Sequence, residues 1–145
     1  ANLIHELADS QSVLRQTFGN DSATNFASPY GEYNSTVVSE IKKLYRSHRS
    51  TDVGFNTLDS FDIYNIKVQN VLSTTTTAEV QNWVNQAVAS NSWLVLVYHE
   101  VNSTNGGSLY STTTTNFDSQ MNVIKNSGIT VKTTNQALDE IVPQL

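Results

Sequence analysis

Cysteine is absent from the 145 residues of this chain, which excludes disulfide bonds, thiolate catalysis and cysteine-bound zinc. Basic residues are scarce, because 8 Lys and Arg stand against 13 Asp and Glu, and the net charge is −5 with no basic cluster. This balance argues against nucleic acid or an anionic membrane as a partner. No apolar run approaches the length of a membrane span. The length predicts one domain, residues 1–145, with room for a real core.

Polar uncharged residues make up much of the chain, since only 38% of the residues are hydrophobic and 14% are charged. Three N-glycosylation acceptor patterns begin at Asn20, Asn34 and Asn102. A chain so rich in Asn, Ser and Thr produces such patterns by chance. They add only a hint that the protein is secreted or extracellular.

Helical and strand patterns alternate along the chain. Apolar spacing predicts a helix over residues 3–18, a second helix capped by Asn34, and a third that starts with the capping-box spacing of Thr76 and Glu79. Further helices are expected over about 115–126 and after Thr134, which can act as a cap. Strands are expected in five places, with loops over 53–64 and 101–110: residues 24–27, 45–50, 66–71, 93–98 and 129–132.

The run from Trp93 to Tyr98 is the most apolar stretch and shows no alternation, which suits a strand buried on both faces of a helix-covered parallel sheet. It is followed at once by His99 and Glu100. In α/β barrels and open α/β sheets, chemistry occurs where strands give way to loops at their C-terminal ends. His99 is therefore the first candidate for a catalytic side chain.

Alternating helices and strands are typical of right-handed crossovers and a mainly parallel sheet, so an α/β fold is expected. The chain opens on a helix and offers about five strands, whereas a closed barrel of this kind needs about eight. Either the sheet is open, or the N-terminal strands of a (β/α) barrel are not part of this chain.

Three stretches carry a resemblance to a known family. Residues 25–34 read Asn-Phe-Ala-Ser-Pro-Tyr-Gly-Glu-Tyr-Asn, and residues 94–100 read Leu-Val-Leu-Val-Tyr-His-Glu. Between them, residues 45–66 contain Tyr-Arg-Ser-His-Arg-Ser, Gly-Phe-Asn and Asp-x-Tyr-x-Ile. In order and spacing these stretches resemble polysaccharide deacetylases, the NodB-homology proteins of carbohydrate esterase family four. The agreement runs from about Glu6 to Ile141 and covers the C-terminal part of that TIM-barrel-like domain.

The resemblance implies removal of acetyl groups from a polysaccharide such as an N-acetylglucosamine polymer or acetylxylan. In the family a divalent metal, usually zinc, polarises the acetyl carbonyl and activates water. His99 matches the family's general acid, and the backbone N–H of Tyr30 matches its oxyanion contact. Pro29, Leu96 and Tyr98 would line the substrate slot. Arg49 is a candidate to replace the arginine that the family has where Ala27 stands in this chain. Asp59 or Asp62 could be the aspartate that in the family orients the acid histidine.

The family's metal-binding motifs, Thr-Phe-Asp-Asp-Gly and His-x-x-x-His, have no counterpart in this chain, whose only histidines are His5, His48 and His99. A stable zinc site needs roughly three or four protein ligands, and the sequence shows no such set. We therefore expect a half-domain that is inactive alone and that self-associates or pairs with a complementing N-terminal segment, since open parallel sheets leave edge strands uncovered.

Other interpretations remain open. The chain could be a catalytically inactive carbohydrate-binding or structural half, or a glycoside hydrolase that uses paired carboxylates such as Asp62 and Glu100. Several side chains have a structural interpretation as well. His5 and His48 are expected at the surface, Trp83 and Trp93 in the core, and Tyr30 can be an ordinary turn residue. Three further aromatic residues lie in or beside loops and could stack on sugar rings: Phe55, Tyr64 and Tyr110.

Overall fold

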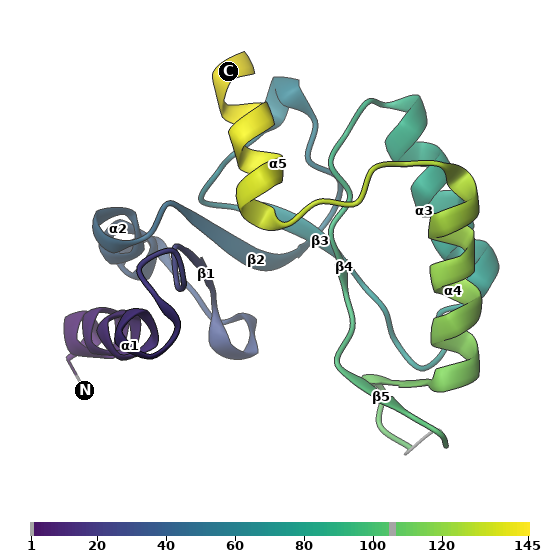
Figure 1. Cartoon of the computed structure of the whole chain (residues 1–145), viewed down its shortest axis with the longest axis horizontal. Helices are drawn as coiled ribbons and strands as arrows, with labels where there is room; N and C mark the ends of the chain where they lie inside the picture. Colours follow the sequence, from purple (N-terminus) through teal and green to yellow (C-terminus); the bar gives the residue numbers. More distant parts are fainter. Residues whose placement is uncertain (1, 105–106) are drawn as a thin grey trace. The chain divides into compact units, whose positions relative to one another are not determined.

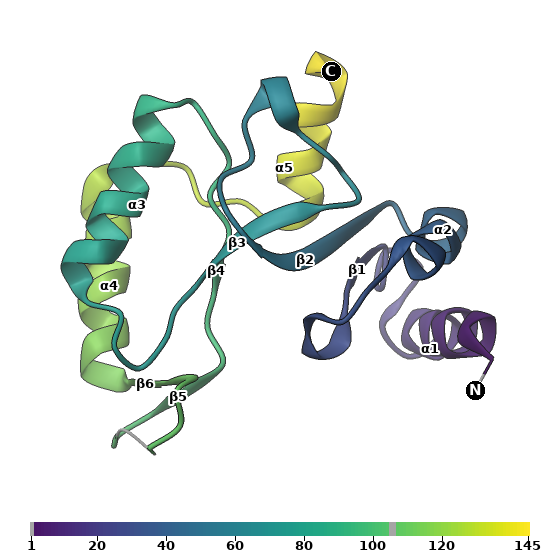
Figure 2. The same ribbon diagram turned by 180° about the vertical axis from the view of Figure 1, so that it is seen from behind.

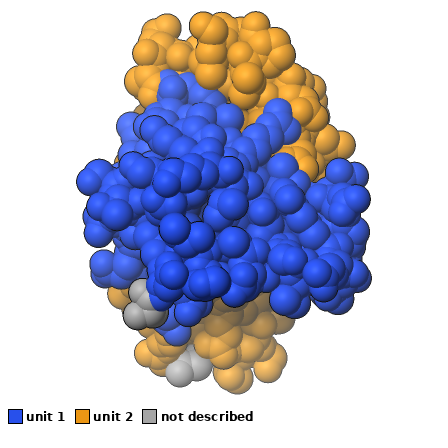
Figure 3. Space-filling model, turned by 90° about the vertical axis from the view of Figure 1, so that its left-hand side faces the viewer, with its two compact units in different colours: residues 1–52, 61–67 blue, residues 53–60, 68–145 orange. Residues whose placement is uncertain are grey.

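A computed structural model describes residues 2–104 and 107–145, and the chain divides into two compact units (Figure 3). Unit 1 consists of residues 1–52 and 61–67. Unit 2 consists of residues 53–60 and 68–145. Each unit has its own helices, strands and buried side chains, and each is described by itself.

Unit 1 is built on a parallel strand pair and two helices. Its elements in chain order are α1 (Leu3–Phe18), β1 (Asn25–Ala27), the 3₁₀ turn η1 (Pro29–Gly31), α2 (Ser35–Leu44), β2 (Ser47–Val53) and the first two residues of β3 (Ile66–Asn70). Strand β1 pairs with β2 in parallel, with Phe26 opposite His48. Helix α1 packs against α2 (Figure 1), and the core between them consists of Leu7, Ile41 and Tyr45. The Tyr45 hydroxyl donates a hydrogen bond of 2.9 Å to the Leu7 carbonyl, which ties the core to α1.

Unit 2 contains the remaining elements. In chain order these are η2 (Leu58–Ser60), the end of β3, α3 (Thr77–Ala89), β4 (Leu96–Val97), β5 (Glu100–Asn102), β6 (Ser111–Thr113), α4 (Thr114–Ser127), α5 (Thr134–Ile141) and η3 (Val142–Gln144). Strand β3 pairs with β4 in parallel, and β5 pairs with β6 in parallel. Helices α3 and α4 lie side by side in both ribbon views (Figures 1 and 2). Val80, Val84 and Leu138 are almost completely buried in this unit.

One sheet consists of four parallel strands in the order β1-β2-β3-β4, and β5 and β6 form a separate pair. The protein is therefore α/β with mainly parallel strands, as the alternating sequence pattern predicts. Its four parallel strands are consistent with a partial β/α barrel. Strand β4 is last in this order, so among the described residues it has a strand on one side only.

The helix boundaries follow from side-chain caps. Asn34 accepts a hydrogen bond of 2.9 Å from the Val37 N–H, and Thr76 and Glu79 form the expected capping box at the start of α3. The predicted first helix over 3–18 is also confirmed. Helix α5 is capped by Thr133 and not by Thr134, because the Thr133 hydroxyl is the one that reaches the Gln136 N–H. The strands expected over 24–27, 45–50 and 66–71 are present with small changes at their ends.

Three local predictions are wrong. Residues 129–132 do not form a strand, and Val131 is 76% exposed, so their alternation reflects no buried face. The loop expected over 101–110 is wrong at its first two residues, which belong to β5, whereas 103–104 and 107–110 form no strand and 105–106 lie outside the described residues. Strand β6 follows the loop at 111–113, and neither short strand carries an apolar pattern. The run from Trp93 to Tyr98 is half-buried along its length and only Leu96–Val97 is strand, because β4 has a single strand neighbour among the described residues.

The two capping boxes in unit 2 make a test of helix stabilisation. Thr76→Ala removes the cap of α3 and should lower the free energy of unfolding by about 1 kcal/mol at neutral pH. The hydrogen bonds from Thr76 lower the pKa of Glu79, so the stability that they supply is present above the unfolded pKa of a glutamate and is lost as the pH falls through the folded pKa. The cost of Thr76→Ala, measured by urea unfolding, should therefore shrink on acidification.

Thr133→Ala is the matched control, because its box uses Gln136, which does not titrate. Its cost should be similar in size and independent of pH. An equal pH dependence of the two substitutions would contradict this assignment.

Candidate functional site

The turn after β1 holds two of the predicted site residues in an unusual backbone conformation. Pro29 and Tyr30 are exposed, and Tyr30 has φ 55°, in the left-handed region that non-glycine residues rarely adopt. Gly31 follows with φ 77°, and a Cβ at this position would lie 2.8 Å from Cγ2 of Thr51 on β2. The close approach to Thr51 therefore requires glycine, and it fixes where Tyr30 projects into solvent.

His48 is completely buried in unit 1, which corrects the expectation that it lies at the surface. Its Nε2 lies 2.8 Å from the Ser28 hydroxyl, and its Nδ1 lies 2.8 Å from the Tyr64 carbonyl oxygen. A carbonyl oxygen only accepts hydrogen bonds, so Nδ1 carries a proton, and in the neutral ring Nε2 is then the atom that accepts from the Ser28 hydroxyl. The imidazole is held in one tautomer by partners that come from the end of β1 and from the segment before β3.

The predicted tuning residue Asp62 lies in that same segment. Its Oδ1 accepts a hydrogen bond of 2.8 Å from the Tyr64 N–H, and its side chain is exposed. Asp62 thus shapes the turn that presents the Tyr64 carbonyl to His48. Arg49, the other predicted tuning residue, is half-buried, and burial lowers the pKa of its guanidinium. Its Nη1 donates a hydrogen bond of 3.2 Å to the Ser50 carbonyl.

A second polar group lies beside His48. The Tyr33 ring meets the imidazole edge-on at 5.1 Å between centroids, and the Tyr33 hydroxyl donates a hydrogen bond of 2.7 Å to Asp52 Oδ2. The same carboxylate oxygen accepts a hydrogen bond of 3.1 Å from Asn65 Nδ2. The hydrogen bond to Asp52, followed by burial, raises the pKa of Tyr33 above its ordinary value. Both side chains lie in unit 1 with Ser28 and His48.

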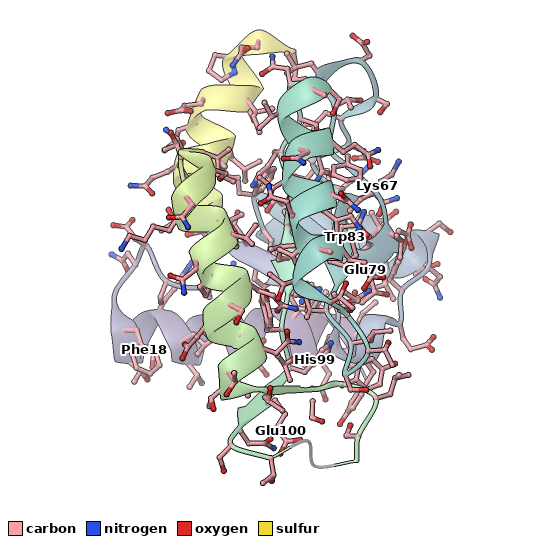
Figure 4. The ribbon with its side chains drawn as sticks, turned by 90° about the vertical axis from the view of Figure 1, so that its right-hand side faces the viewer. Phe18, Lys67, Glu79, Trp83, His99 and Glu100 are labelled. Atoms are coloured by element: carbon pink, nitrogen blue, oxygen red, sulfur yellow. The ribbon has the colours of Figure 1, made fainter. Side chains whose placement is uncertain are left out.

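His99 lies two residues after the last residue of β4, with Tyr98 between them, and it is exposed. Its ring lies 4.8 Å from the Tyr110 ring, with 58° between the ring planes. Glu100 is the first residue of β5, and its Oε1 accepts a hydrogen bond of 2.8 Å from Asn102. Figure 4 shows both labelled side chains at the end of unit 2 where α4 begins. An exposed imidazole beside a phenol is free to exchange protons with solvent and ligands.

Tyr98 precedes His99 and belongs to a buried hydrogen-bond chain. Its hydroxyl donates a hydrogen bond of 2.9 Å to Gln120 Oε1, and Gln120 Nε2 donates one of 3.0 Å to the Thr75 carbonyl. Its ring packs edge-on against Phe117 at 5.0 Å. Burial raises the pKa of Tyr98 to about 12. The hydroxyl predicted to line the substrate slot is therefore already engaged within unit 2, while the neighbouring Leu96 is half-buried in β4.

The predicted site residues thus fall into two groups, one in each unit. Unit 1 holds Pro29, Tyr30, Arg49 and Asp62, and unit 2 holds Leu96, Tyr98 and His99. Sequence reasoning missed the polar group around His48, which consists of Ser28, Tyr33, Asp52, Tyr64 and Asn65. The sequence signal for it is that these residues lie within the segments 25–34 and 45–66, which resemble deacetylases.

No family model, no curated protein and no solved structure matches this chain. Across residues 2–104 and 107–145, no group of three or more His, Cys, Asp or Glu side chains is placed to hold a metal ion. The zinc that the family resemblance implies stays a prediction, since these residues neither place its ligands nor exclude them. None of the described helices combines the length and apolar character that crossing a membrane requires.

A shallow depression in unit 2 lies apart from every predicted site residue. It has a volume of about 370 Å³ and is bordered by residues of the 130–132 segment and of α5, namely Thr130, Val131, Lys132, Gln136, Asp139 and Glu140. Lys132 and Glu140 pair across it. One basic side chain, Lys132, and two acidic side chains, Asp139 and Glu140, lie at its border.

Gly31→Ala tests the close approach that positions Tyr30. The substitution should cost at least ~2 kcal/mol of unfolding free energy, because a left-handed alanine costs roughly 1–2 kcal/mol and the clash with Thr51 adds to it. Gly128→Ala is the control, since Gly128 has φ 71° and open space around its Cβ. The double variant with Thr51→Ala should recover the steric part. Equal costs for Gly31→Ala and Gly128→Ala in urea unfolding would contradict the contact.

Tyr98→Phe tests the buried chain in unit 2. Removing the hydroxyl leaves Gln120 Oε1 without its donor, and Gln120 is completely buried, so unfolding should become easier by about 1–3 kcal/mol. In an alkaline titration of tyrosinate absorbance, the step near pH 12 should disappear. Tyr30→Phe should change neither quantity, because Tyr30 is fully exposed. A Tyr98→Phe variant as stable as the parent would refute the assignment.

Proposed function

We propose that this chain is the C-terminal portion of a polysaccharide deacetylase domain, a carbohydrate esterase that removes acetyl groups from an N-acetylglucosamine polymer or from acetylxylan. The observation that supports it is positional. Pro29-Tyr30-Gly31 begins two residues after the last residue of the parallel strand β1, and His99 lies two residues after the last residue of the parallel strand β4. Residues after the C-terminal ends of parallel strands are where α/β proteins place their chemistry.

Each of the two residues has a role in this proposal. His99 is the general acid, because its exposed ring can carry a proton to a leaving amine or alcohol. The backbone N–H of Tyr30 is the contact for the oxyanion, and its left-handed conformation is the kind of local strain that accompanies functional positions. The nucleophile and the metal ligands would come from the segment that the family carries upstream of Glu6.

The same picture implies a partner and a location. Strand β4 has a strand on one side only among the described residues, so a complementing N-terminal segment or a second copy of the chain would add to that edge. Polymeric sugars are met mainly outside the cell, and the proposal accordingly includes a secreted or extracellular protein.

The alternative is a carbohydrate-binding half without catalysis. Two exposed aromatic side chains favour it as a second candidate, because Tyr30 is fully exposed and Tyr110 is half-exposed beside His99. Aromatic faces at the surface provide flat apolar area against which sugar rings can stack. In this alternative the protein binds the polysaccharide but does not catalyse its deacetylation.

Titration calorimetry with N-acetylated chito-oligosaccharides and acetylated xylo-oligosaccharides, combined with an acetate assay in the presence of zinc, tests the proposal. We expect saturable binding of one acetylated series and no acetate release by the chain alone. His99→Ala and Tyr30→Ala should each weaken binding at least about threefold, a loss of ~0.7 kcal/mol. His5→Ala is the control, because His5 is exposed and paired with Asp9 on α1.

The outcomes separate the readings. Zinc-dependent turnover by the chain alone would contradict the half-domain. Binding that His99→Ala leaves unchanged would favour the carbohydrate-binding alternative. Failure to bind either acetylated series would contradict both.

A further inference from the structure

Ser28 and His48 form a buried pair in unit 1 that the proposed function does not use. The Ser28 hydroxyl lies 2.8 Å from His48 Nε2, and the opposite ring nitrogen is held by the Tyr64 carbonyl at 2.8 Å. A hydroxyl, a neutral imidazole that accepts its proton, and a third group that orients the imidazole are the three parts of an activated serine. Here a backbone carbonyl takes the orienting position.

Ser28 differs from Ser50, another buried serine of unit 1, in its hydrogen-bond partner. Ser50 lies two residues after His48 on β2, and its hydroxyl donates a hydrogen bond of 3.3 Å to the Ile66 carbonyl. A carbonyl oxygen cannot take a proton at neutral pH, whereas a neutral imidazole can. Ser28 is therefore paired with a base, and Ser50 is not.

The position of Ser28 gives small molecules a route to it. Ser28 is buried, with 6% of the residue exposed, and both chain neighbours, Ala27 and Pro29, are exposed. The hydroxyl thus lies one residue beneath the surface at the C-terminal end of β1, where a small acyl group needs only a local shift of the turn to reach it.

The surroundings of His48 suit a ring that becomes positively charged for a short time. The Tyr64 carbonyl would accept the Nδ1–H of the imidazolium, and the Tyr33 ring lies 5.1 Å away. Tyr33 in turn donates to the Asp52 carboxylate, which places negative charge behind the phenol. Positive charge on the imidazole is favoured electrostatically by the Asp52 carboxylate behind the phenol.

From this geometry we propose that Ser28 is a nucleophile activated by His48 and that it accepts acyl groups from small esters. The Ser28 hydroxyl transfers its proton to His48 Nε2 while Oγ bonds to the acyl carbon. The ester bond then breaks, and the leaving alkoxide takes the proton back from Nε2. Water repeats the sequence: its proton passes to Nε2, its oxygen bonds to the acyl carbon, and Ser28 leaves and recovers its proton.

This reaction is independent of the deacetylase proposal. It uses Ser28 and His48, whereas the deacetylase roles belong to His99 and to the backbone of Tyr30. The two are distinguished by substrate and by metal, since the serine reaction needs no zinc and takes activated small esters. Either proposal can fail while the other stands.

The test is covalent labelling of the intact chain with a fluorophosphonate in the presence of EDTA, read by intact mass and by peptide mapping. The reagent forms a bond from Ser28 Oγ to phosphorus and releases fluoride, while His48 takes the proton. We expect one adduct per chain, located on Ser28, formed at least about 10²-fold faster than on the urea-unfolded protein. The native chain should also release p-nitrophenol from p-nitrophenyl acetate without zinc.

Three variants locate the chemistry. Ser28→Ala should abolish the adduct, and His48→Gln should slow it at least about tenfold, with folding checked by circular dichroism. Ser50→Ala is the matched control and should label as the parent does, because that buried serine has no histidine partner.

The proposal fails if the native chain shows no adduct, if the adduct lies on another serine, or if the native and unfolded proteins label at equal rates. It also fails if a folded His48→Gln variant labels at the parent rate. Should His48→Gln not fold, the comparison of native with unfolded parent chain decides the matter.

Discussion

The burial of one imidazole is the constraint on which unit 1 depends. His48 has no solvent-exposed surface, so both ring nitrogens need partners inside the protein, and each unmet partner would cost about 1–3 kcal/mol. Ser28 at the end of β1 and the Tyr64 carbonyl before β3 supply them. Three segments far apart in sequence are thereby held together. The parallel register that places Phe26 opposite His48 is the one that brings Ser28 within reach of the ring and Gly31 against Thr51. A slip of one residue would lose these contacts together.

In unit 2 a buried amide, rather than an imidazole, joins distant segments through hydrogen bonds. Gln120 is completely buried on α4 and bridges the Tyr98 hydroxyl and the Thr75 carbonyl. Asn116 donates to the same carbonyl from one turn earlier on α4, so the helix is joined to the chain before α3 by two hydrogen bonds. With only 38% hydrophobic residues, the protein relies on such buried polar contacts beside its small apolar clusters. Directional contacts specify one arrangement, because a hydrogen bond is lost over a shift that an apolar contact tolerates.

The sequence predicts much of this fold because helix starts are local. Asn34, Thr76 and Glu79 act within one turn of the helix that they cap, so their spacing alone reveals them. Strand patterns are less local. Ile129 and Val131 alternate as a strand would, yet no described strand pairs with them, whereas the polar strands β5 and β6 pair through their backbones and show no apolar alternation. The burial of Trp93–Tyr98 depends on which strand lies beyond β4, and no pattern within that run records its neighbours.

The candidate site also combines features that local sequence predicts with contacts that depend on distant segments. Strand-end logic places Tyr30 and His99 correctly after β1 and β4, because it needs only the order of elements along the chain. It cannot find the pair of Ser28 and His48, since their contact follows from the register between two strands separated by a helix. The residues around His48 are Ser47, Arg49 and Ser50, and a polar run of this kind is typical of a solvated surface. Polar side chains become buried only where another segment satisfies them, so their partners must be known before their burial can be predicted. In this chain composition and periodicity therefore assign His48 to solvent, although it is completely buried.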